Sequence, residues 1–312
     1  MEAQSKLKAM SRLALFSAAL IWGSSFFIVK NTVDVFPTYW LLASRFIIAC
    51  TLLSIIFFKK LKQLNKSYFI NGGIIGLCLF CAYSFQTFGI AHTSPGKNAF
   101  LTAVYCVIVP FLFWIVDKSK PDIYNFLAAG LCLCGIGLVS LTGDFSIGIG
   151  DFLTLIGGFF YASHMVSVAK LSRGKDPVLV TIVQFGFTGT FALIAALFTE
   201  SLPTSVSAAS LSGILYLAVF CTATALLLQN IGQKNTPPAA ASIILSLEAV
   251  FGIIFSMIFY GERLTPRLAC GFLIIFCAVI VSETKLAFLR KTNVVIPTVE
   301  VTPSAVCGEV RK

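Results

Sequence analysis

Two ionisable side chains stand inside long apolar stretches of this sequence. Glu248 lies within "ILSLEAVFGIIF", and Arg45 lies within "ASRFIIA". If these stretches cross a bilayer, each charge costs about 2.5–3.5 kcal/mol at mid-membrane on insertion scales, so it needs a partner or a cavity. We expect Glu248 to bind an amine or carry a proton, or else to tie helices together. We expect Arg45 to recognise a carboxylate, or else to snorkel or to pair with Glu248.

Neutral polar side chains recur at helical spacing in other apolar stretches. Asn98, Thr102 and Tyr105 follow at steps of four and three, which places them on one face of a helix. Lipid cannot satisfy their hydrogen bonds, so this face suits a cavity wall; the alternative is hydrogen bonding between packed helices. The predicted solute-contacting residues are Trp22, Ser24, Tyr83, Gln86, Asn98, Thr102, Tyr105, Tyr161 and His164, the last also a candidate proton relay.

The sequence lacks the motifs of common enzymes and pumps. It has no phosphate-binding loop, which argues against ATP-driven pumping, and its two histidines are isolated. Cys78 and Cys81 have metal-type spacing, but no second pair or histidine lies near them. Cysteines inside apolar stretches are better read as small hydrophobic packing residues. We therefore predict no metal, no cofactor and no enzymatic activity.

The segments that carry these residues are too apolar for a soluble protein. Of 312 residues, 57% are hydrophobic and 12% charged, whereas about a quarter are charged in soluble proteins. The whole stretch between Asp122 and Asp144 contains no charged residue, and about 20 apolar residues suffice for a helix to cross a bilayer. We predict an all-α integral membrane protein whose first apolar segment is retained as a span, because it lacks a cleavage site.

Apolar runs and the turn residues between them predict ten transmembrane helices. An even number of spans places both termini on one side. With the N-terminus inside, eighteen lysines and arginines lie in cytoplasmic segments and four in outer ones, so both termini are expected in the cytoplasm. This orientation explains the net charge of +10 without nucleic-acid binding. The spans are approximately 12–30, 38–58, 68–91, 96–116, 122–142, 151–170, 177–198, 209–231, 237–260 and 266–284.

The sequence also repeats internally at an offset of about 140 residues. "IWGSSFFIVK" matches "FYASHMVSVAK", with Trp22 opposite Tyr161, and Cys81 matches Cys221. "HTSPG" matches "NTPPA" at a slightly larger offset. Each half has five spans, an odd number, so the two copies must cross the membrane in opposite directions. Inverted repeats of this kind are typical of secondary transporters.

These features together resemble the EamA family of the drug/metabolite transporter superfamily. The resemblance rests on "ALIWGSSFFIVK", on Arg45 in the second span, and on "LEAVFGIIFSMIFYGERLTPRLACGFLII" in the last two spans. It covers about residues 12–284, and "GERLT" followed by Gly271 is its most specific part. Family members often carry proline after the acid of the ninth span, where this chain has Ala249.

The resemblance implies an organisation and an activity. We expect an N-terminal cytoplasmic tail at 1–11, five-helix repeats at 12–142 and 151–284, and a polar, disordered cytoplasmic tail at 285–312. The family implies export of amino acids or related small metabolites across the plasma membrane. The expected partners are the bilayer, a solute and, if Glu248 couples transport, protons; one subunit could suffice. A non-transporting scaffold or sensor and an intramembrane enzyme are the alternatives, and the enzyme would need a second acid or histidine at the depth of Glu248.

Overall fold

The computed structural model describes residues 2–118, 120–141, 146–203, 206–234, 236 and 238–286. Every regular element in these residues is a helix. Nine of the described helical segments are long and apolar enough to cross a membrane, and a shorter apolar helix at Ile244–Tyr260 adds a tenth. This confirms the predicted all-α fold with ten spans. Most of the predicted C-terminal tail, residues 287–312, lies outside the described residues.

The first repeat supplies five spans. Its fourth span is divided into two helices, and its first helix starts at Glu2, so helix also covers the segment expected as an N-terminal tail. The helices are α1 (Glu2–Val33), α2 (Thr38–Ile56), the short α3 (Phe58–Leu61), α4 (Lys66–Ala91), α5 (Pro95–Thr102), α6 (Tyr105–Asp117) and α7 (Ile123–Ser140).

The second repeat supplies the other five spans, two of which contain π-helical segments. A π-helix spaces its hydrogen bonds five residues apart and is frequent at functional sites. The elements are α8 (Ile149–Leu171), α9 (Pro177–Thr199), α10 (Ala208–Tyr216), π-helical η1 (Leu217–Thr224), α11 (Ala225–Lys234), α12 (Pro238–Phe255), π-helical η2 (Ser256–Tyr260) and α13 (Pro266–Thr284).

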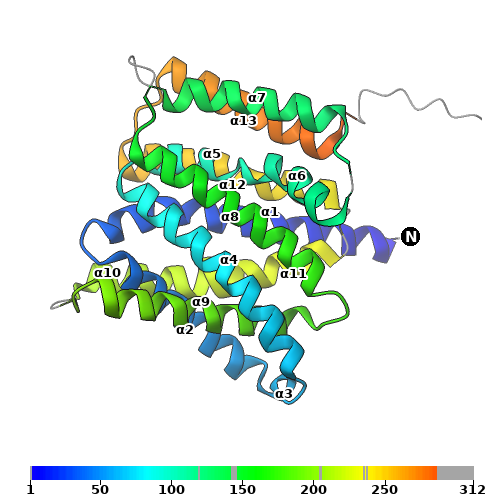
Figure 1. Cartoon of the computed structure of the whole chain (residues 1–312), viewed down its shortest axis with the longest axis vertical. Coiled ribbons are helices and arrows are strands. Elements are labelled where there is room, and N and C mark those ends of the chain that lie inside the picture. The colour runs from blue at the N-terminus through cyan, green and yellow to red at the C-terminus, as the bar shows by residue number, and fades with distance from the viewer. Residues whose placement is uncertain are drawn as a thin grey trace, which may run out of the picture.

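Helix packing follows a two-fold pattern that exchanges the repeats. Spans in equivalent positions pair with each other: α2 lies against α9, and α7 lies against α13 at one edge of the bundle (Figure 1). Other contacts come in exchanged pairs. The third span α4 packs on the sixth span α8, and the first span α1 packs on η1 and α11 of the eighth. Likewise α1 packs on α12, and α8 packs on α5 and α6. The predicted inverted repeats therefore form one interlocked bundle.

Glycine permits the close approach of α7 and α13. A Cβ added at Gly135 would lie 2.6 Å from Cγ1 of Ile275, and one added at Gly271 would lie 2.6 Å from Cγ2 of Val139. Both distances are far below van der Waals contact, so a larger residue would push the helices apart. Small residues at helix interfaces are typical of membrane bundles, because they let backbones approach. Gly271 of the family motif thus acts in packing.

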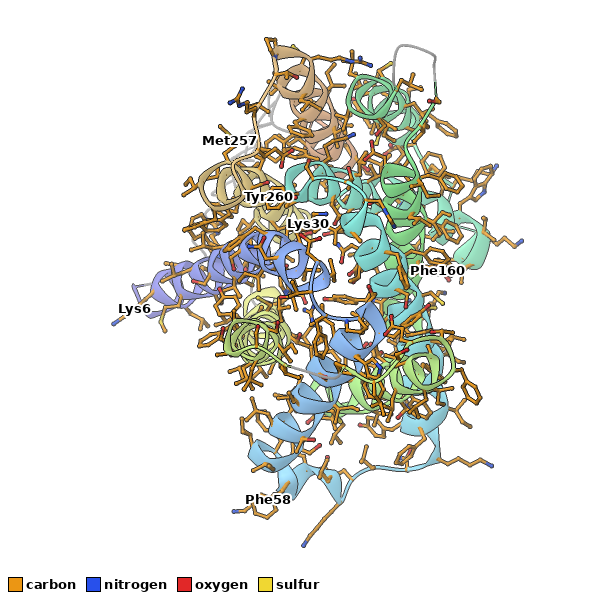
Figure 2. The ribbon with its side chains drawn as sticks, turned by 90° about the vertical axis from the view of Figure 1, so that its left-hand side faces the viewer. Lys6, Lys30, Phe58, Phe160, Met257 and Tyr260 are labelled. Carbon is orange, nitrogen blue, oxygen red and sulfur yellow. The ribbon has the colours of Figure 1, made fainter. Side chains whose placement is uncertain are left out.

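The outside of the bundle is apolar and the inside holds the polar groups. Phe58 is 59% exposed and Met257 is 43% exposed, and both project outward in Figure 2. By contrast Arg45 and Asn98 are buried. A surface of this kind suits lipid rather than water, and buried polar groups in such a bundle must be satisfied by other helices or by a cavity.

Candidate functional site

A cavity of about 170 Å³ open to water-sized molecules lies between the two repeats. One water needs about 10–15 Å³ of space on this measure, so the cavity can hold several waters or a small organic solute. Its lining comes from α1, α2, α4, α5, α6, α8, α9, η1, α11 and α12. Every span that carries a predicted site residue is among these, and the seventh span, α9, contributes as well.

The structure brings the predicted site residues together, with one exception. Ser24 does not line the cavity: its hydroxyl donates to the Ile21 carbonyl at 2.7 Å and lies 2.8 Å from the Tyr216 hydroxyl on α10. The next residue, Ser25, lines the cavity in its place. One residue is a rotation of about 100° around a helix, which is enough to move a side chain off the face. The predicted residues that line the cavity are Trp22, Arg45, Tyr83, Gln86, Asn98, Thr102, Tyr105, Tyr161, His164 and Glu248.

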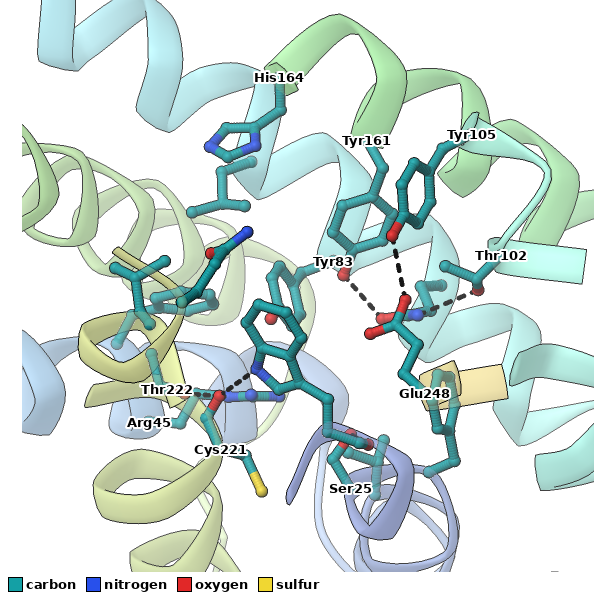
Figure 3. Close-up of a pocket in the computed structure, with 18 of the residues that line it drawn as sticks. Ser25, Arg45, Tyr83, Thr102, Tyr105, Tyr161, His164, Cys221, Thr222 and Glu248 are labelled. Carbon is teal, nitrogen blue, oxygen red and sulfur yellow. Dashed lines mark hydrogen bonds between the residues drawn. The ribbon is translucent and has the colours of Figure 1, made fainter. Parts of the chain in front are cut away.

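Glu248 enters the cavity from α12. The Tyr105 hydroxyl donates to its Oε1 at 3.2 Å (Figure 3). The residue is 8% exposed, and its other oxygen accepts no hydrogen bond from the described part of the chain. The carboxylate is therefore sheltered from bulk solvent and only partly satisfied by the protein.

Arg45 enters the cavity from α2. Its Nε donates to Thr222 Oγ1 at 3.1 Å, and its guanidinium carbon lies 4.8 Å from the centre of the Tyr83 ring. Thr222 belongs to π-helical η1, where its hydroxyl also donates to the carbonyl of Leu217, five residues earlier. None of the ion pairs formed by described residues includes Arg45. The two charges of the cavity, Arg45 and Glu248, thus form no ion pair with each other.

A network of amides and hydroxyls joins α4, α5 and α8 beside Glu248. Gln86 is its centre: Nε2 donates to Thr102 Oγ1 at 3.0 Å, and Oε1 accepts from the Tyr161 hydroxyl at 2.8 Å. Asn98 Nδ2 donates to Thr154 Oγ1 at 2.7 Å and to the Gln86 carbonyl at 3.2 Å. These bonds fix the orientation of the Gln86 amide and of the Tyr161 ring toward the cavity.

Sequence reasoning missed several lining residues. Gln184 on α9 lies 2.9 Å from Nε2 of His164, and Thr222, Gln229 and Ser25 also face the cavity. One signal could have found Gln184: it is a lone amide in the otherwise apolar or hydroxyl-bearing "VTIVQFGF". The role of Thr222 depends on the π-helical segment, for which the sequence carries no evident signal.

Each of the two charged residues of the cavity has a neutral residue at the equivalent position of the other repeat. Arg45 and Gln184 are each the eighth residue of their helices, α2 and α9. Their neighbours Phe46 and Phe185 are also equivalent, and their ring centres lie 5.4 Å apart. The cavity therefore sits where equivalent surfaces of the two repeats meet.

The fourth and ninth spans meet in the same way. Tyr105 stands ten residues after Pro95, which begins α5, and Glu248 stands ten residues after Pro238, which begins α12. The hydrogen bond between Tyr105 and Glu248 thus joins two equivalent positions. One repeat supplies the acid and the other supplies its hydroxyl donor.

Two acidic residues stabilise the turn between α4 and α5. This turn lies at the end of the bundle opposite the connection from α2 to α4, which contains Lys59, Lys60 and Lys62. Asp151 of α8 accepts from the Thr93 hydroxyl at 2.6 Å and pairs with Lys97 at 2.5 Å. Glu262 accepts from the Gly96 amide at 2.9 Å and from the hydroxyls of two serines, Ser94 and Ser256. The "GERLT" motif therefore fixes the start of α5, which carries part of the cavity wall.

Comparison with known proteins gives the same result for both halves of the chain. The model of the EamA-like transporter family matches residues 10–141 and 148–284. The chain belongs to the EamA-like transporter family. A protein of Archaeoglobus fulgidus named an uncharacterized transporter is 33% identical over 271 residues, and the alignment covers 86% of this chain and 85% of that protein. The Escherichia coli protein named uncharacterized inner membrane transporter YedA is 25% identical, and the alignment covers 92% of this chain and 95% of that protein.

A solved crystal structure agrees with the fold. The superposition covers 90% of this chain and 98% of the chain in that structure, with a TM-score of 0.63 at 15% sequence identity. At this identity the similarity concerns the fold alone. Family membership and the transporter names of the relatives make this chain a multi-span membrane transporter and point away from an enzyme.

Proposed function

We propose that this EamA-like protein is a secondary transporter that exports a small organic solute by alternating access. The observation that carries the proposal is the cavity of about 170 Å³ lined by equivalent positions of two inverted repeats. Two such repeats have two near-equivalent packings, and rocking between them opens a shared site to each side in turn.

The proposed solute-contacting residues are those that face the cavity from both repeats. Arg45 and Glu248 supply its charges, and the neutral contacts come from three spans of the first repeat and one of the second. Ser24, directed at α10, is left out of this set. The neutral contacts are Trp22, Tyr83, Gln86, Asn98, Thr102, Tyr105, Tyr161 and His164.

The proposed location is the plasma membrane with both termini in the cytoplasm. The concentration of lysine and arginine in alternate connections supports this orientation. The name of the Escherichia coli relative, an inner membrane transporter, supports the location. Export rather than uptake is what the family resemblance implies.

Glu248 also gives transport a route for coupling to protons. A carboxyl that opens onto the cavity and has one donor in the described part of the chain, Tyr105, can take up a proton from one side and release it to the other. Facilitated diffusion without coupling fits the same cavity. Transport in proteoliposomes with and without a pH gradient separates the two, because coupling predicts solute accumulation only when the gradient is present.

The other candidate functions have less support. A scaffold or sensor would favour dry packing of the third and fourth spans, whereas α4, α5 and α6 line a cavity. An intramembrane enzyme would need a second catalytic group near Glu248, and Glu248 is the one acid among the cavity-lining residues in the described part of the chain.

The proposal is tested with purified protein in liposomes loaded with a bacterial metabolite extract. Solutes that leave are identified by mass spectrometry and compared with protein-free liposomes. We expect a small set of metabolites to leave, and we expect Glu248→Gln to slow them while Ser24→Ala, which alters a residue outside the cavity, does not. Release of no solute from liposomes that contain folded, inserted protein would contradict the proposal.

A further inference from the structure

We propose that a basic corner of the bundle binds the phosphate headgroup of an anionic phospholipid. The corner is formed by the connection from α2 to α4, the start of α4 and the connection from α8 to α9, at the edge of the bundle where Figure 1 shows α3. It is the cytoplasmic end in the proposed orientation, and it is separate from the central cavity. The cations of the basic corner are Lys59, Lys60, Lys62, Lys66, Arg173 and Lys175.

The basic corner holds far more positive than negative charge. Asp176 is the one acidic residue in segments 57–71 and 171–177 of the sequence. Its carboxylate pairs with Lys60 at 2.6 Å. None of the ion pairs formed by described residues includes the other five cations of the corner. Five positive charges without an acidic partner create a potential that attracts an anion.

Contacts between segments far apart in the chain hold these cations near one another. Lys175 Nζ donates to Ser67 Oγ at 2.6 Å and lies 5.1 Å from the centre of the Tyr68 ring. The Asp176 amide donates to the Tyr68 hydroxyl at 2.9 Å, and the pair between Asp176 and Lys60 attaches α3 to the same connection. The cations of the two repeats are therefore gathered before any ligand arrives.

The start of α4 adds to the positive potential. Asn65 caps this helix by accepting a hydrogen bond from the Ser67 amide at 3.0 Å, and the first turn contains no acidic residue. The amides at a helix N-terminus carry a partial positive charge that favours phosphate. An anion beside Lys66 therefore meets the charge of the side chain and the dipole of the helix together.

Exposed apolar side chains beside the cations identify a lipid as the source of the anion. Phe58 precedes Lys59 and is 59% exposed, and Phe69 stands three residues after Lys66 and is 50% exposed. Phe58 projects outward at the lower edge of the bundle in Figure 2. Basic pockets between transmembrane helices bind anionic headgroups, and lysine can keep its stem on apolar surface while its charge reaches a phosphate. A phospholipid matches this surface because its acyl chains cover the apolar side chains.

The connection between α6 and α7, at the same end of the bundle, supplies a matched control. It has an acid at each end, Asp117 and Asp122, and each forms an ion pair with a lysine from elsewhere in the chain. Lys118 and Lys120 lie between these acids and are exposed. A phosphate there would approach two carboxylates, so we expect little binding of anionic lipid at this connection.

The test uses the full-length protein, purified in detergent and stripped of lipid. Phosphatidylglycerol, which is anionic, and phosphatidylcholine with the same acyl chains are titrated separately, and native mass spectrometry measures the bound lipid. Glycerol 3-phosphate, which has the phosphate without acyl chains, is added in parallel as a competitor. The double variant Lys62→Gln with Lys66→Gln is compared with Lys118→Gln with Lys120→Gln, since each removes two exposed lysines from the same end of the bundle.

We expect the parent to bind phosphatidylglycerol about tenfold or more tightly than phosphatidylcholine, because each cation near an anionic headgroup strengthens binding several-fold. Lys62→Gln with Lys66→Gln should lower the affinity for phosphatidylglycerol by about tenfold or more for the same reason. Lys118→Gln with Lys120→Gln should leave it unchanged. Lys62→Arg with Lys66→Arg keeps both charges and should keep the affinity, which separates loss of charge from a structural effect.

Three results would overturn the proposal. Equal affinity of the parent for the two lipids would show that the headgroup charge is not recognised, and this measurement needs no variant. An equal loss of affinity in the two glutamine variants would show a general surface charge in place of a site. Displacement of phosphatidylglycerol by an equimolar amount of glycerol 3-phosphate would show that the basic corner takes a soluble phosphate compound. None of these results bears on the transport activity, which is tested separately.

Discussion

The Tyr105 hydroxyl and the Glu248 carboxylate share a 3.2 Å hydrogen bond, and the two residues occupy equivalent positions in the inverted repeats. The contact lies at the cavity, where the fourth and ninth spans meet. In the proposed rocking of one repeat against the other, these two residues belong to the two parts that move. The hydrogen bond is therefore expected to report on the transport cycle.

Removing this hydroxyl should slow transport without unfolding the protein. Tyr105→Phe leaves Glu248 without its protein donor, and a hydrogen bond to a charged group is worth about 1.5–3 kcal/mol, so we expect transport to fall by about tenfold or more. Efflux from proteoliposomes measures the effect. Tyr260→Phe, at an exposed position on η2, is the matched control and should behave as the parent. Equal rates for the parent and Tyr105→Phe would contradict a role for this contact.

Thr222 is expected to position Arg45 for solute binding. Thr222→Val keeps the shape of the side chain but removes the oxygen that accepts from Arg45 Nε, so the guanidinium loses one of its anchors. We expect weaker solute binding, by about tenfold, with normal expression and insertion. Thr224→Val in the same π-helical segment is the control, because its hydroxyl bonds the Val219 carbonyl and not Arg45. Solute affinity can be measured by isothermal titration calorimetry in detergent. Equal solute affinity of the Thr222→Val and Thr224→Val variants would contradict a positioning role for Thr222.

Glu262 is expected to stabilise the turn that starts α5. Glu262→Ala removes the acceptor for the Gly96 amide and for the Ser94 and Ser256 hydroxyls. Loss of an acceptor for partly buried donors costs about 1–3 kcal/mol, so the melting temperature in detergent should fall by several degrees. Arg263→Gln, at the exposed neighbouring position, should leave it unchanged. An unchanged melting temperature for Glu262→Ala would show that water replaces these contacts at no cost.

The ion pair between Lys60 and Asp176 is expected to make the stability of the protein depend on pH. Burial acts to raise the pKa of Asp176, but hydrogen bonds from Lys60, at 2.6 Å, and from the Val178 amide outweigh it, so the pKa is lowered. A lowered carboxyl pKa contributes stability above the unfolded value of about 3.9 and loses it as the pH falls through the folded pKa.

Asp176→Asn should therefore be less stable than the parent at neutral pH. Asparagine still caps α9, so the substitution removes mainly the charge. The difference in melting temperature should shrink as the pH falls below about 4. Lys60→Gln should reproduce the loss, and the double variant should add little to either single one. A difference that stays constant from neutral to acidic pH would show that the ion pair is not its source.

The sequence contained enough to identify the membrane class, the number of spans and the repeat. Length and apolarity decide whether a helix can cross a bilayer, and these are properties of each segment alone. The regular spacing of Asn98, Thr102 and Tyr105 identified a polar face because lipid penalises such a face wherever the helix lies. Charges inside apolar stretches pointed to Glu248 and Arg45 for the same reason.

Only the tertiary structure decided which neighbours those residues meet. Spans that are apolar on every side give no signal for the face that points inward, so Ser24 and Ser25 could not be told apart from their sequence. The π-helical segment that brings Thr222 to Arg45, and the separation of Arg45 from Glu248, arise from packing between helices far apart in the chain. The sequence by itself determined which groups must avoid lipid, because that cost is local; the structure decided how they are satisfied, because that depends on the partners that the fold brings near.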